Sequence, residues 1–291
     1  MPSAVECVVR VSNQLGESPV WCDRTDRLYW VDSREPAVYW HDLATGRTQQ
    51  RTLTEIIGSI GLRETHGLIA ALRTGFHLLD PETGAVTPLV DPEPHLNENR
   101  FNDGRCDRGG RFWAGTMSDV RRDATGALYC LEPDTTCRRV FGEVIVPNSI
   151  AWSPDSRHMY FADTYRSVIT QFDFDVHEGH LSAPRVFRDT SRHPGRPDGS
   201  AVDETGCLWN AEYGGARIVR YTPSGVIDTV VAMPVTCPTC CVFGGPALDT
   251  LFITSARQRL TSGQLAEQPL AGAVFAFVPG VCGVPEGRYD G

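Results

Sequence analysis

A short strand pattern recurs along the chain at a nearly constant interval, and this repeat restricts the possible folds more than any other feature. Its copies, each a run of apolar, aromatic or small residues, are Leu28–Asp32, Leu68–Leu72, Phe112–Gly115, Met159–Asp163, Leu208–Glu212 and Leu251–Ser255. Successive copies begin roughly 40 to 50 residues apart, the period of a four-stranded β-propeller blade. The six copies therefore predict six blades.

A second pattern follows each copy and supports the same period. It alternates apolar and polar residues and in most copies ends in an acidic or Gly turn, as expected for a half-buried strand entering a hairpin. The copies begin at Val38, Phe76, Leu128, Ile169, Ile218 and Val274. Helical periodicity of any length is absent. We predict an all-β fold, one six-bladed β-propeller domain over residues 1–291, closed by a strand near Glu6 to Val11 that completes the last blade.

The charge balance and the termini limit the possible partners and the compartment. The chain has 27 Lys and Arg against 36 Asp and Glu, a net charge of −9, and no basic run. A phosphate backbone is therefore an unsuitable partner, and we expect no nucleic-acid binding. No secretory signal pattern and no apolar run of membrane-spanning length is present. We expect a cytoplasmic monomer without a membrane partner.

Ten cysteines are spread along the chain. Without a secretory signal, we expect most of them to be reduced, buried thiols. Cys237, Cys240 and Cys241 form one CxxC motif followed by a further cysteine. A structural zinc site needs four ligands, and no second CxxC or paired His motif accompanies this one. The role of these three cysteines stays open.

Polar residues suited to binding oxygen-rich ligands lie between Asn97 and Met117. Arg100 and Asn102 are placed in an expected loop directly before an aromatic strand, Arg111 to Met117. Loops held by a rigid scaffold commonly carry function. Asn-Asp-Gly and Arg-Gly-Gly are also ordinary turn signals, so a simple hairpin would account for this segment equally well.

Three further side chains lie at equivalent points, in expected loops before apolar runs: Glu17, Asn148 and Asp198. Loops at one end of a propeller channel converge, so these residues can meet although they are far apart in sequence. Their oxygen atoms suit Ca²⁺, Mg²⁺ or Mn²⁺, with Zn²⁺ and Fe²⁺ as further candidates. Taken singly, each also fits a structural role in a turn.

The motifs together resemble one known family, the regucalcin (senescence marker protein)/gluconolactonase family. The matching segments are Leu15–Trp21, Asn99–Gly104, Trp113–Met117, Pro147–Asn148, Ala151–Asp155, Tyr160–Thr164, Pro197–Gly199 and Phe243–Pro246. The resemblance implies a six-bladed propeller with a central metal-binding channel, one divalent metal ion and hydrolysis of sugar lactones. It assigns Glu17, Asn148 and Asp198 to the metal, with Asp198 also the catalytic base. Arg100 and Asn102 would hold the substrate.

The resemblance leaves the substrate open. Candidates are pentono- and hexonolactones of carbohydrate catabolism, such as arabinono-, xylono-, galactono- or gluconolactone. Arg121 and Arg122, in the lid segment after Met117, would even suit an anionic sugar lactone. Ser18 and Ser149 stand where the family commonly has Gly. The alternatives are another metal-dependent esterase or phosphotriesterase, a non-catalytic calcium-binding regulator, and a protein-binding platform.

Four residues at expected strand ends are further candidates for the channel mouth. They are Tyr165, Trp209, Tyr213 and Arg257. Either contact with the substrate or packing would account for each of them.

Overall fold

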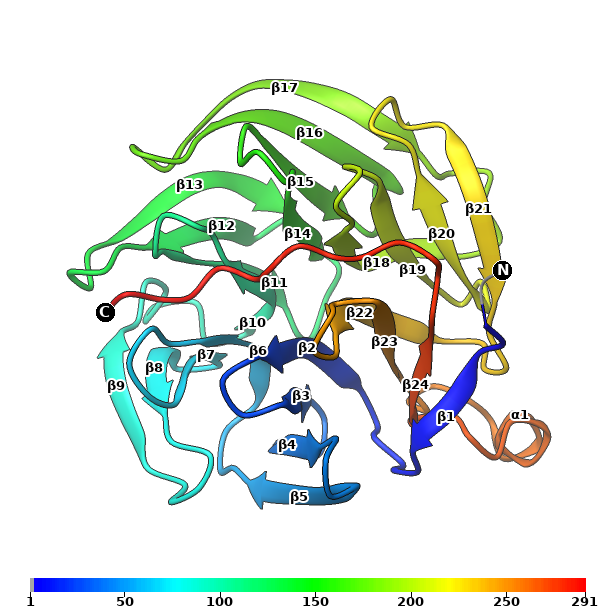
Figure 1. Cartoon of the computed structure of the whole chain (residues 1–291). Coiled ribbons are helices and arrows are strands. Elements are labelled where there is room, and N and C mark those ends of the chain that lie inside the picture. Colours follow the sequence, from blue (N-terminus) through cyan, green and yellow to red (C-terminus); the bar gives the residue numbers. More distant parts are fainter. Residues whose placement is uncertain (1–2) are drawn as a thin grey trace.

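Six antiparallel sheets of four strands surround a common centre (Figure 1). The computed structural model describes residues 3–291. Each sheet is one blade, and its strands follow one another from the centre to the periphery. The prediction of an all-β, six-bladed β-propeller is confirmed.

The strands have the following bounds, blade by blade. The first two blades contain β2 Gly16–Cys22, β3 Arg27–Asp32, β4 Ala37–Asp42, β5 Arg47–Thr52, β6 Ile57–Leu62, β7 Leu68–Leu72, β8 Gly75–Leu79 and β9 Val86–Val90. The next two contain β10 Asn99–Cys106, β11 Phe112–Ser118, β12 Gly126–Leu131, β13 Cys137–Val144, β14 Pro147–Trp152, β15 His158–Asp163, β16 Val168–Asp175 and β17 His180–Asp189. The last two contain β18 Arg196–Val202, β19 Leu208–Tyr213, β20 Arg217–Tyr221, β21 Ile227–Ala232, β22 Pro238–Gly244, β23 Thr250–Ser255, β24 Val274–Phe277 and β1 Glu6–Val9.

The ring is closed by a strand from the N-terminal part of the chain. β1 pairs with β24 as the outermost strand of the last blade, with Glu6 opposite Ala276. The predicted closing strand near Glu6 to Val11 is therefore confirmed. This pairing joins segments from near both ends of the chain in one sheet.

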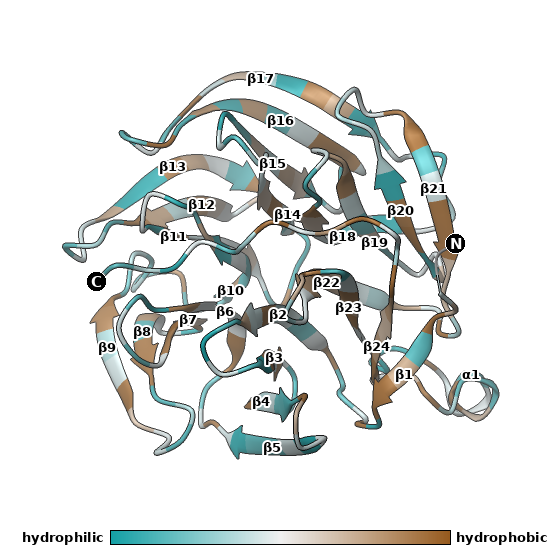
Figure 2. Cartoon of the chain, in the orientation of Figure 1, coloured by the Kyte–Doolittle hydropathy of each residue, from teal (hydrophilic) through white to brown (hydrophobic). Residues whose placement is uncertain are grey.

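The core is divided into layers, because each pair of neighbouring blades encloses its own apolar cluster. Between the third and fourth blades, for example, Trp113 packs edge-on against Trp152 and Phe174, with ring centroids 6.2 and 5.9 Å away. The inner strand β7, Leu-Ile-Ala-Ala-Leu, is buried throughout. The outermost strand β5, Arg-Thr-Gln-Gln-Arg-Thr, is exposed throughout and hydrophilic in Figure 2.

One short helix was not predicted from the sequence. Helix α1, Ser262–Glu267, begins with a capping box in which Thr261 and Gln264 bond to each other's backbone. Its six residues are too few to establish a helical apolar period, which explains why no periodicity marked it. No helix in residues 3–291 has the length and apolar character needed to cross a membrane.

The C-terminal segment, residues 278–291, runs across one face of the propeller, where it is drawn in red in Figure 1. It is fixed by backbone bonds from Glu204 to Cys282 and from Tyr289 to Leu62. Under it, Arg105 pairs with Glu286 at 2.9 Å. This end of the channel, where the innermost strands end, is the closed mouth. The opposite end, where those strands begin, is the open mouth.

Candidate functional site

A bulge in every innermost strand shapes the open mouth. Each of β2, β6, β10, β14, β18 and β22 has one more residue than its partner strand across a break in the pairing register. Bulges of this kind re-aim side chains and are common beside functional sites. One position in each bulged region is structurally equivalent in all six blades. It lies four residues before the innermost-strand residue that pairs with the first apolar residue of the second strand, as Trp21 pairs with Leu28. The residues at this position are Glu17, Gly58, Asn102, Asn148, Asp198 and Thr239.

The predicted site residues therefore lie on strands, and the expectation that they lie in loops was wrong. Glu17 belongs to β2, Asn148 to β14 and Asp198 to β18. Arg100 and Asn102 belong to β10, not to a loop before an aromatic strand. One edge of each innermost strand faces the channel and has no neighbouring strand to pair with. Proline and glycine, which are turn signals in a sequence, are therefore tolerated there.

The two serines that replace glycine sit in these bulges. Ser18 and Ser149 have φ values of 49° and 58°, in the left-handed region that favours glycine. Both hydroxyls link neighbouring blades. Ser18 Oγ accepts from the backbone N–H of Ile60 at 2.9 Å, and Ser149 Oγ donates to the Asp198 carbonyl at 2.7 Å. These bonds offset the backbone strain and keep the bulges in place.

Glu17 and Asp198 are buried carboxylates with few hydrogen-bond donors. Their exposed fractions are 8% and 5%. Each carboxylate receives support from the backbone N–H of the residue that follows it, Ser18 or Gly199. Buried charges are normally paired or coordinated to a metal, so this pair is incomplete on its own.

Asn148 is held in one orientation by its neighbours. Its Nδ2 donates to Thr164 Oγ1 at 2.7 Å, and Thr164 in turn donates to the Pro197 carbonyl at 2.8 Å. The amide oxygen of Asn148 accepts from Asn102 Nδ2 at 3.2 Å. Because the nitrogen is engaged on one side, the oxygen is the atom available as a ligand on the other.

The pKa values show how strongly the open mouth disfavours bare negative charge. Burial, and then the neighbouring Asp103, raise the pKa of Glu17 to about 8. Burial and then Glu17 raise the pKa of Asp198 well above its usual range. Burial also raises the pKa of Asp103 to about 6. A divalent cation would neutralise this repulsion, and the oxygen-only donor set of Glu17, Asn148 and Asp198 fits one.

Within residues 3–291, no three or more His, Cys, Asp and Glu side chains lie together in a group that could hold a metal ion. The set predicted here contains two carboxylates and one amide, which is a different kind of group. Its role in metal binding therefore stays a prediction. All ten cysteines, including Cys237, Cys240 and Cys241, are free thiols.

Arg100 is almost fully buried beside these groups and is fixed by several contacts. Its Nε donates to Asp119 Oδ1 at 2.8 Å, while Nη1 donates to the carbonyl of Phe101 and to Asn102 Oδ1. Burial and then Arg34 lower the pKa of Arg100 to about 10, against the attraction of Asp119. Within residues 3–291, the second terminal nitrogen, Nη2, has no hydrogen-bond partner. It is a donor that a substrate can use.

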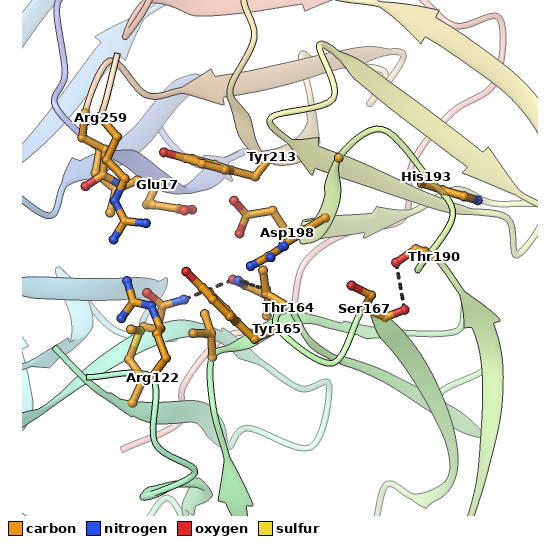
Figure 3. Close-up of a pocket in the computed structure, with 18 of the residues that line it drawn as sticks. Glu17, Arg122, Thr164, Tyr165, Ser167, Thr190, His193, Asp198, Tyr213 and Arg259 are labelled. Atoms are coloured by element: carbon orange, nitrogen blue, oxygen red, sulfur yellow. Dashed lines mark hydrogen bonds between the residues drawn. The ribbon is translucent and has the colours of Figure 1, made fainter. Parts of the chain in front are cut away.

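A cavity of about 440 Å³ opens above these residues, and all five predicted site residues line it. In Figure 3, Glu17, Asp198 and Tyr213 lie around its centre, and Arg122 and Arg259 reach it from separate parts of the chain. Among the other candidates, Tyr165 and Tyr213 line the cavity. Trp209 is buried in the core between two blades, and Arg257 is absent from the lining.

The comparison with protein families decides where the chain belongs. The family model described as "SMP-30/Gluconolactonase/LRE-like region" matches residues 15–257, more than half of the chain. The chain belongs to this family. The resemblance found in the sequence motifs is thereby confirmed.

Individual relatives match over the whole chain. A 6-deoxy-6-sulfogluconolactonase of Pseudomonas putida is 37% identical over 292 residues, covering 100% of both chains. Regucalcin of Bos taurus is 34% identical, covering 99% of this chain and 98% of that protein. Among solved structures, a calcium-binding protein, regucalcin from Agrobacterium tumefaciens, superposes with a TM-score of 0.94 at 28% identity, covering 99% of this chain and 97% of that one.

Four cavity contributors were not identified from the sequence as functional. Asp119 anchors Arg100, and Thr164 orients Asn148. Arg196 and Arg259 line the open mouth. Asp119 and Thr164 act through other side chains, so no local motif marks them. The recurrence of a polar residue at one register position in five of the six innermost strands was the signal available for the rest of the site.

Proposed function

We propose that this chain is a sugar lactonase that uses one divalent metal ion to hydrolyse an aldonolactone to the aldonic acid. Membership of the SMP-30/gluconolactonase/LRE-like family and the full-length similarity to a sulfogluconolactonase support the reaction class. The observation that carries the proposal is the pair of buried, donor-poor carboxylates, Glu17 and Asp198, beside Asn148 in a cavity with a buried arginine.

Glu17, Asn148 and Asp198 would hold the metal. When bound, such an ion supplies Lewis-acid polarisation of the lactone carbonyl and lowers the pKa of water. Two carboxylates and one amide leave room for substrate and solvent around a cation that takes about six or more oxygen ligands. Ca²⁺, Zn²⁺, Mn²⁺, Mg²⁺ and Fe²⁺ remain the candidates, because oxygen donors discriminate poorly among them.

The side chains of this protein have distinct tasks in the reaction. Asp198 would accept the proton of the attacking water, since its carboxylate lines the cavity and has few hydrogen-bond donors. Arg100 offers its Nη2 group to a sugar hydroxyl and is prevented from turning by Asp119 and Asn102. The amide oxygen of Asn102 accepts from Arg100, and its amide nitrogen donates to Asn148. Asn102 therefore connects the substrate side of the cavity to the metal side. Such positioning lowers the entropic cost of the reaction.

The cavity volume suits a monosaccharide. Small-molecule sites usually measure about 300 to 1,000 Å³, and this one lies in the lower part of that range. Pentono- and hexonolactones both fit, including arabinono-, xylono-, galactono- and gluconolactone. The name of the Pseudomonas putida relative adds a gluconolactone with a sulfo group at carbon 6 to the candidates.

Two other functions are kept as alternatives. A metal-dependent esterase or phosphotriesterase would use the same carboxylates, because one fold hosts many reactions. A non-catalytic calcium-binding regulator is the second, and the Agrobacterium tumefaciens structure is described as a calcium-binding protein. The free donor on Arg100 and the open cavity favour a site that also binds a substrate.

The proposal is tested by following proton release with chelator-stripped protein on a panel of aldono-1,4- and 1,5-lactones. Mg²⁺, Ca²⁺, Mn²⁺, Zn²⁺ and Fe²⁺ are restored one at a time. We expect hydrolysis that depends on an added ion. Faster cleavage of phosphotriesters than of lactones would favour the first alternative. Tight calcium binding without turnover on any ester would favour the second.

A further inference from the structure

The open mouth carries more positive charge than its own acidic residues balance. Five arginines line the cavity: Arg34, Arg100, Arg122, Arg196 and Arg259. The acidic residues in the same lining are Glu17 and Asp198, which are assigned to the metal. Beneath the lining, Asp119 pairs with both Arg34 and Arg100 at 2.8 Å, and also with Arg73. One carboxylate therefore serves three guanidinium groups.

The other three arginines have no carboxylate partner in the part of the chain that the structure describes. Within residues 3–291, no Asp or Glu oxygen lies within 4.0 Å of the charged nitrogens of Arg122, Arg196 or Arg259. These residues come from separate places in the chain: the segment after β11, the start of β18 and the segment after β23. The fold thus brings three unpaired cations to one cavity. Arg196 and Arg259 are exposed and Arg122 is half-buried, so water screens their mutual repulsion, and a bound anion would reduce it further.

Tyr165 is the centre around which these cations gather. The guanidinium carbon of Arg196 lies 4.3 Å from the Tyr165 ring centroid, and that of Arg122 lies 5.2 Å away. Although burial acts in the opposite direction, Arg122 and Arg259 lower the pKa of the Tyr165 hydroxyl by hydrogen bonding and by their charge. The Tyr165 ring attracts both of these guanidinium groups through cation–π interaction. We name Arg122, Arg196, Arg259 and Tyr165 the arginine cluster.

The arginine cluster adjoins the proposed metal site. Tyr165 directly follows Thr164, whose hydroxyl accepts from Asn148. Arg196 lies two residues before Asp198 on the same strand, β18. A ligand that places its reacting carbonyl near Asp198 therefore extends its far end toward these cations. Figure 3 shows Tyr165 projecting into the cavity between Arg122 and Asp198.

We propose that the arginine cluster is a subsite for an anionic group carried by the lactone at the end away from its carbonyl. This inference rests on the proposed function and narrows it to sugar lactones bearing a carboxylate, sulfonate or phosphate. Guanidinium groups match such groups because their planar N–H donors bond two oxygens at once. The subsite is partly open to water, so we expect each arginine to contribute about fivefold in affinity and the three together about a hundredfold.

The test uses two probe pairs that differ only in the anionic group. Calorimetry measures the binding of 6-phosphogluconate and of gluconate. Proton release measures the hydrolysis of 6-phosphoglucono-1,5-lactone and of glucono-1,5-lactone. The variants are Arg122→Gln, Arg196→Gln, Arg259→Gln and the triple replacement. The matched control is Arg192→Gln, which removes an exposed arginine outside the cavity lining. Thermal unfolding verifies that each variant is folded.

We expect the wild type to bind 6-phosphogluconate at least tenfold more tightly than gluconate, and the triple replacement to lose this preference. The ratio of kcat/KM for the two lactones should fall in parallel, and added salt should weaken the binding of 6-phosphogluconate more strongly than that of gluconate, which carries only the carboxylate. The control should retain the wild-type ratio. Corresponding sulfonated and carboxylated lactones then rank the anionic groups.

Equal affinity of the wild type for both probes would overturn the proposal. So would an unchanged ratio in the folded triple variant. The lactonase function and the anionic subsite can be refuted independently of each other. Arginine-dependent binding of 6-phosphogluconate without hydrolysis of any lactone would refute the proposed function and leave the subsite standing. Hydrolysis of the neutral lactone without any preference for an anion would refute the subsite and leave the proposed function standing.

Discussion

Two buried aspartates, Asp198 near the start of strand β18 and Asp203 directly after its end, show how differently this fold treats a negative charge. Asp203, at the closed mouth, is fully buried and surrounded by donors. Its carboxylate accepts from Trp209 Nε1 at 2.9 Å, Arg220 Nε at 2.8 Å and the backbone N–H of Cys207 at 3.1 Å. Asp198, at the open mouth, is 5% exposed and takes a bond from the N–H of Gly199 alone among residues 3–291.

The contrast recurs in other blades. At the closed mouth, Asp107 accepts from Trp113 Nε1 at 2.8 Å and from the backbone of Gly109 at 2.8 Å. At the open mouth, the Glu17 carboxylate accepts, among residues 3–291, only a 3.3 Å bond from the backbone N–H of Ser18. A buried carboxylate with its donors in place stabilises the fold. One without them costs stability and is expected where a cation or a reaction uses it.

The largest effect should come from Asp198→Asn, which keeps the shape of the side chain and removes its charge. We expect turnover of the lactone to fall by about a thousandfold, because the proton acceptor and a metal ligand are both altered. The midpoint of thermal unfolding of the chelator-stripped protein should stay equal to the wild type or rise, since the repulsion with Glu17 is removed. Proton release and a thermal scan measure the two quantities.

A folded Asp198→Asn protein with near-normal turnover would refute the assignment of Asp198. A large loss of stability in this variant would contradict the contrast between the two mouths. Calorimetric titration with Ca²⁺ or Mn²⁺ serves as an additional measurement, because a metal ligand should also change the affinity for the ion.

The same isosteric change directly after the end of β18, Asp203→Asn, should lower stability and leave turnover nearly unchanged. It places an amide against Trp209, Arg220 and two backbone donors, and it removes the buried one of the two carboxylates that pair with Arg220, leaving Asp228. We expect the free energy of unfolding to fall by about 3 kcal/mol. Turnover per folded molecule should stay within about twofold of wild type, because distant sites act independently. Urea unfolding and active-site-normalised rates test this.

Wild-type stability of Asp203→Asn would show that its donors are dispensable. A large loss of turnover in the folded variant would show that the two ends of the channel are coupled. Either result would mean that the open and the closed mouth do not differ in the way they treat a buried carboxylate.

The propeller itself could be predicted because each second strand repeats a recognisable apolar run. Leu68–Leu72 was predicted with the bounds of β7, and Val274–Phe277 with those of β24. The innermost strands were mistaken for loops, since Pro147, Pro197 and their neighbouring Gly and Asn residues are ordinary turn signals. Their place at the channel edge, where a bulge and a free strand edge tolerate proline, depends on tertiary structure and leaves no local pattern.

Glu17, Asn148 and Asp198 could be selected because they repeat at one register position, and the family motifs strengthened the choice. Asp119 and Arg259 could not be selected in this way. Asp119 acts by holding Arg34, Arg73 and Arg100, which come from three other segments. Arg259 follows the last blade's inner strands without any motif. Contacts between segments so far apart in sequence become visible only when the blades are arranged in space.

A smaller effect is expected from Thr164→Val, which keeps the side-chain shape but removes the hydroxyl that orients Asn148. The affinity for the divalent ion should fall about tenfold, as is usual when a group that orients a metal ligand is lost. The matched control is Thr205→Val at the closed mouth, where the hydroxyl bonds to Asp203 at 2.7 Å. Calorimetric metal titration should show a change in the first variant alone. An equal change in both would mean that a general loosening of the fold is responsible.

The smallest effect should follow from Asp119→Asn, which leaves Arg34, Arg73 and Arg100 without their shared carboxylate. Although burial acts in the opposite direction, hydrogen bonds from Arg34 and Arg100 hold the pKa of Asp119 well below its ordinary value. The variant should lose about 1 kcal/mol of stability at pH 7. Its KM for a neutral lactone should rise about fivefold with little change in kcat, because Arg100 is less firmly held.

The pH dependence distinguishes this ion-pair role of Asp119 from simple packing. A carboxyl whose pKa is lower in the folded than in the unfolded protein binds fewer protons when folded. It therefore stabilises the fold above its unfolded pKa of about 4, and this contribution is lost as the pH falls below that value. The stability difference between wild type and Asp119→Asn, measured by urea unfolding, should shrink from pH 7 to pH 3. The exposed Asp123→Asn serves as the control and should show no such difference. A constant difference across this range would mean that the charge of Asp119 does not hold the arginines, and that the open mouth owes its order to packing.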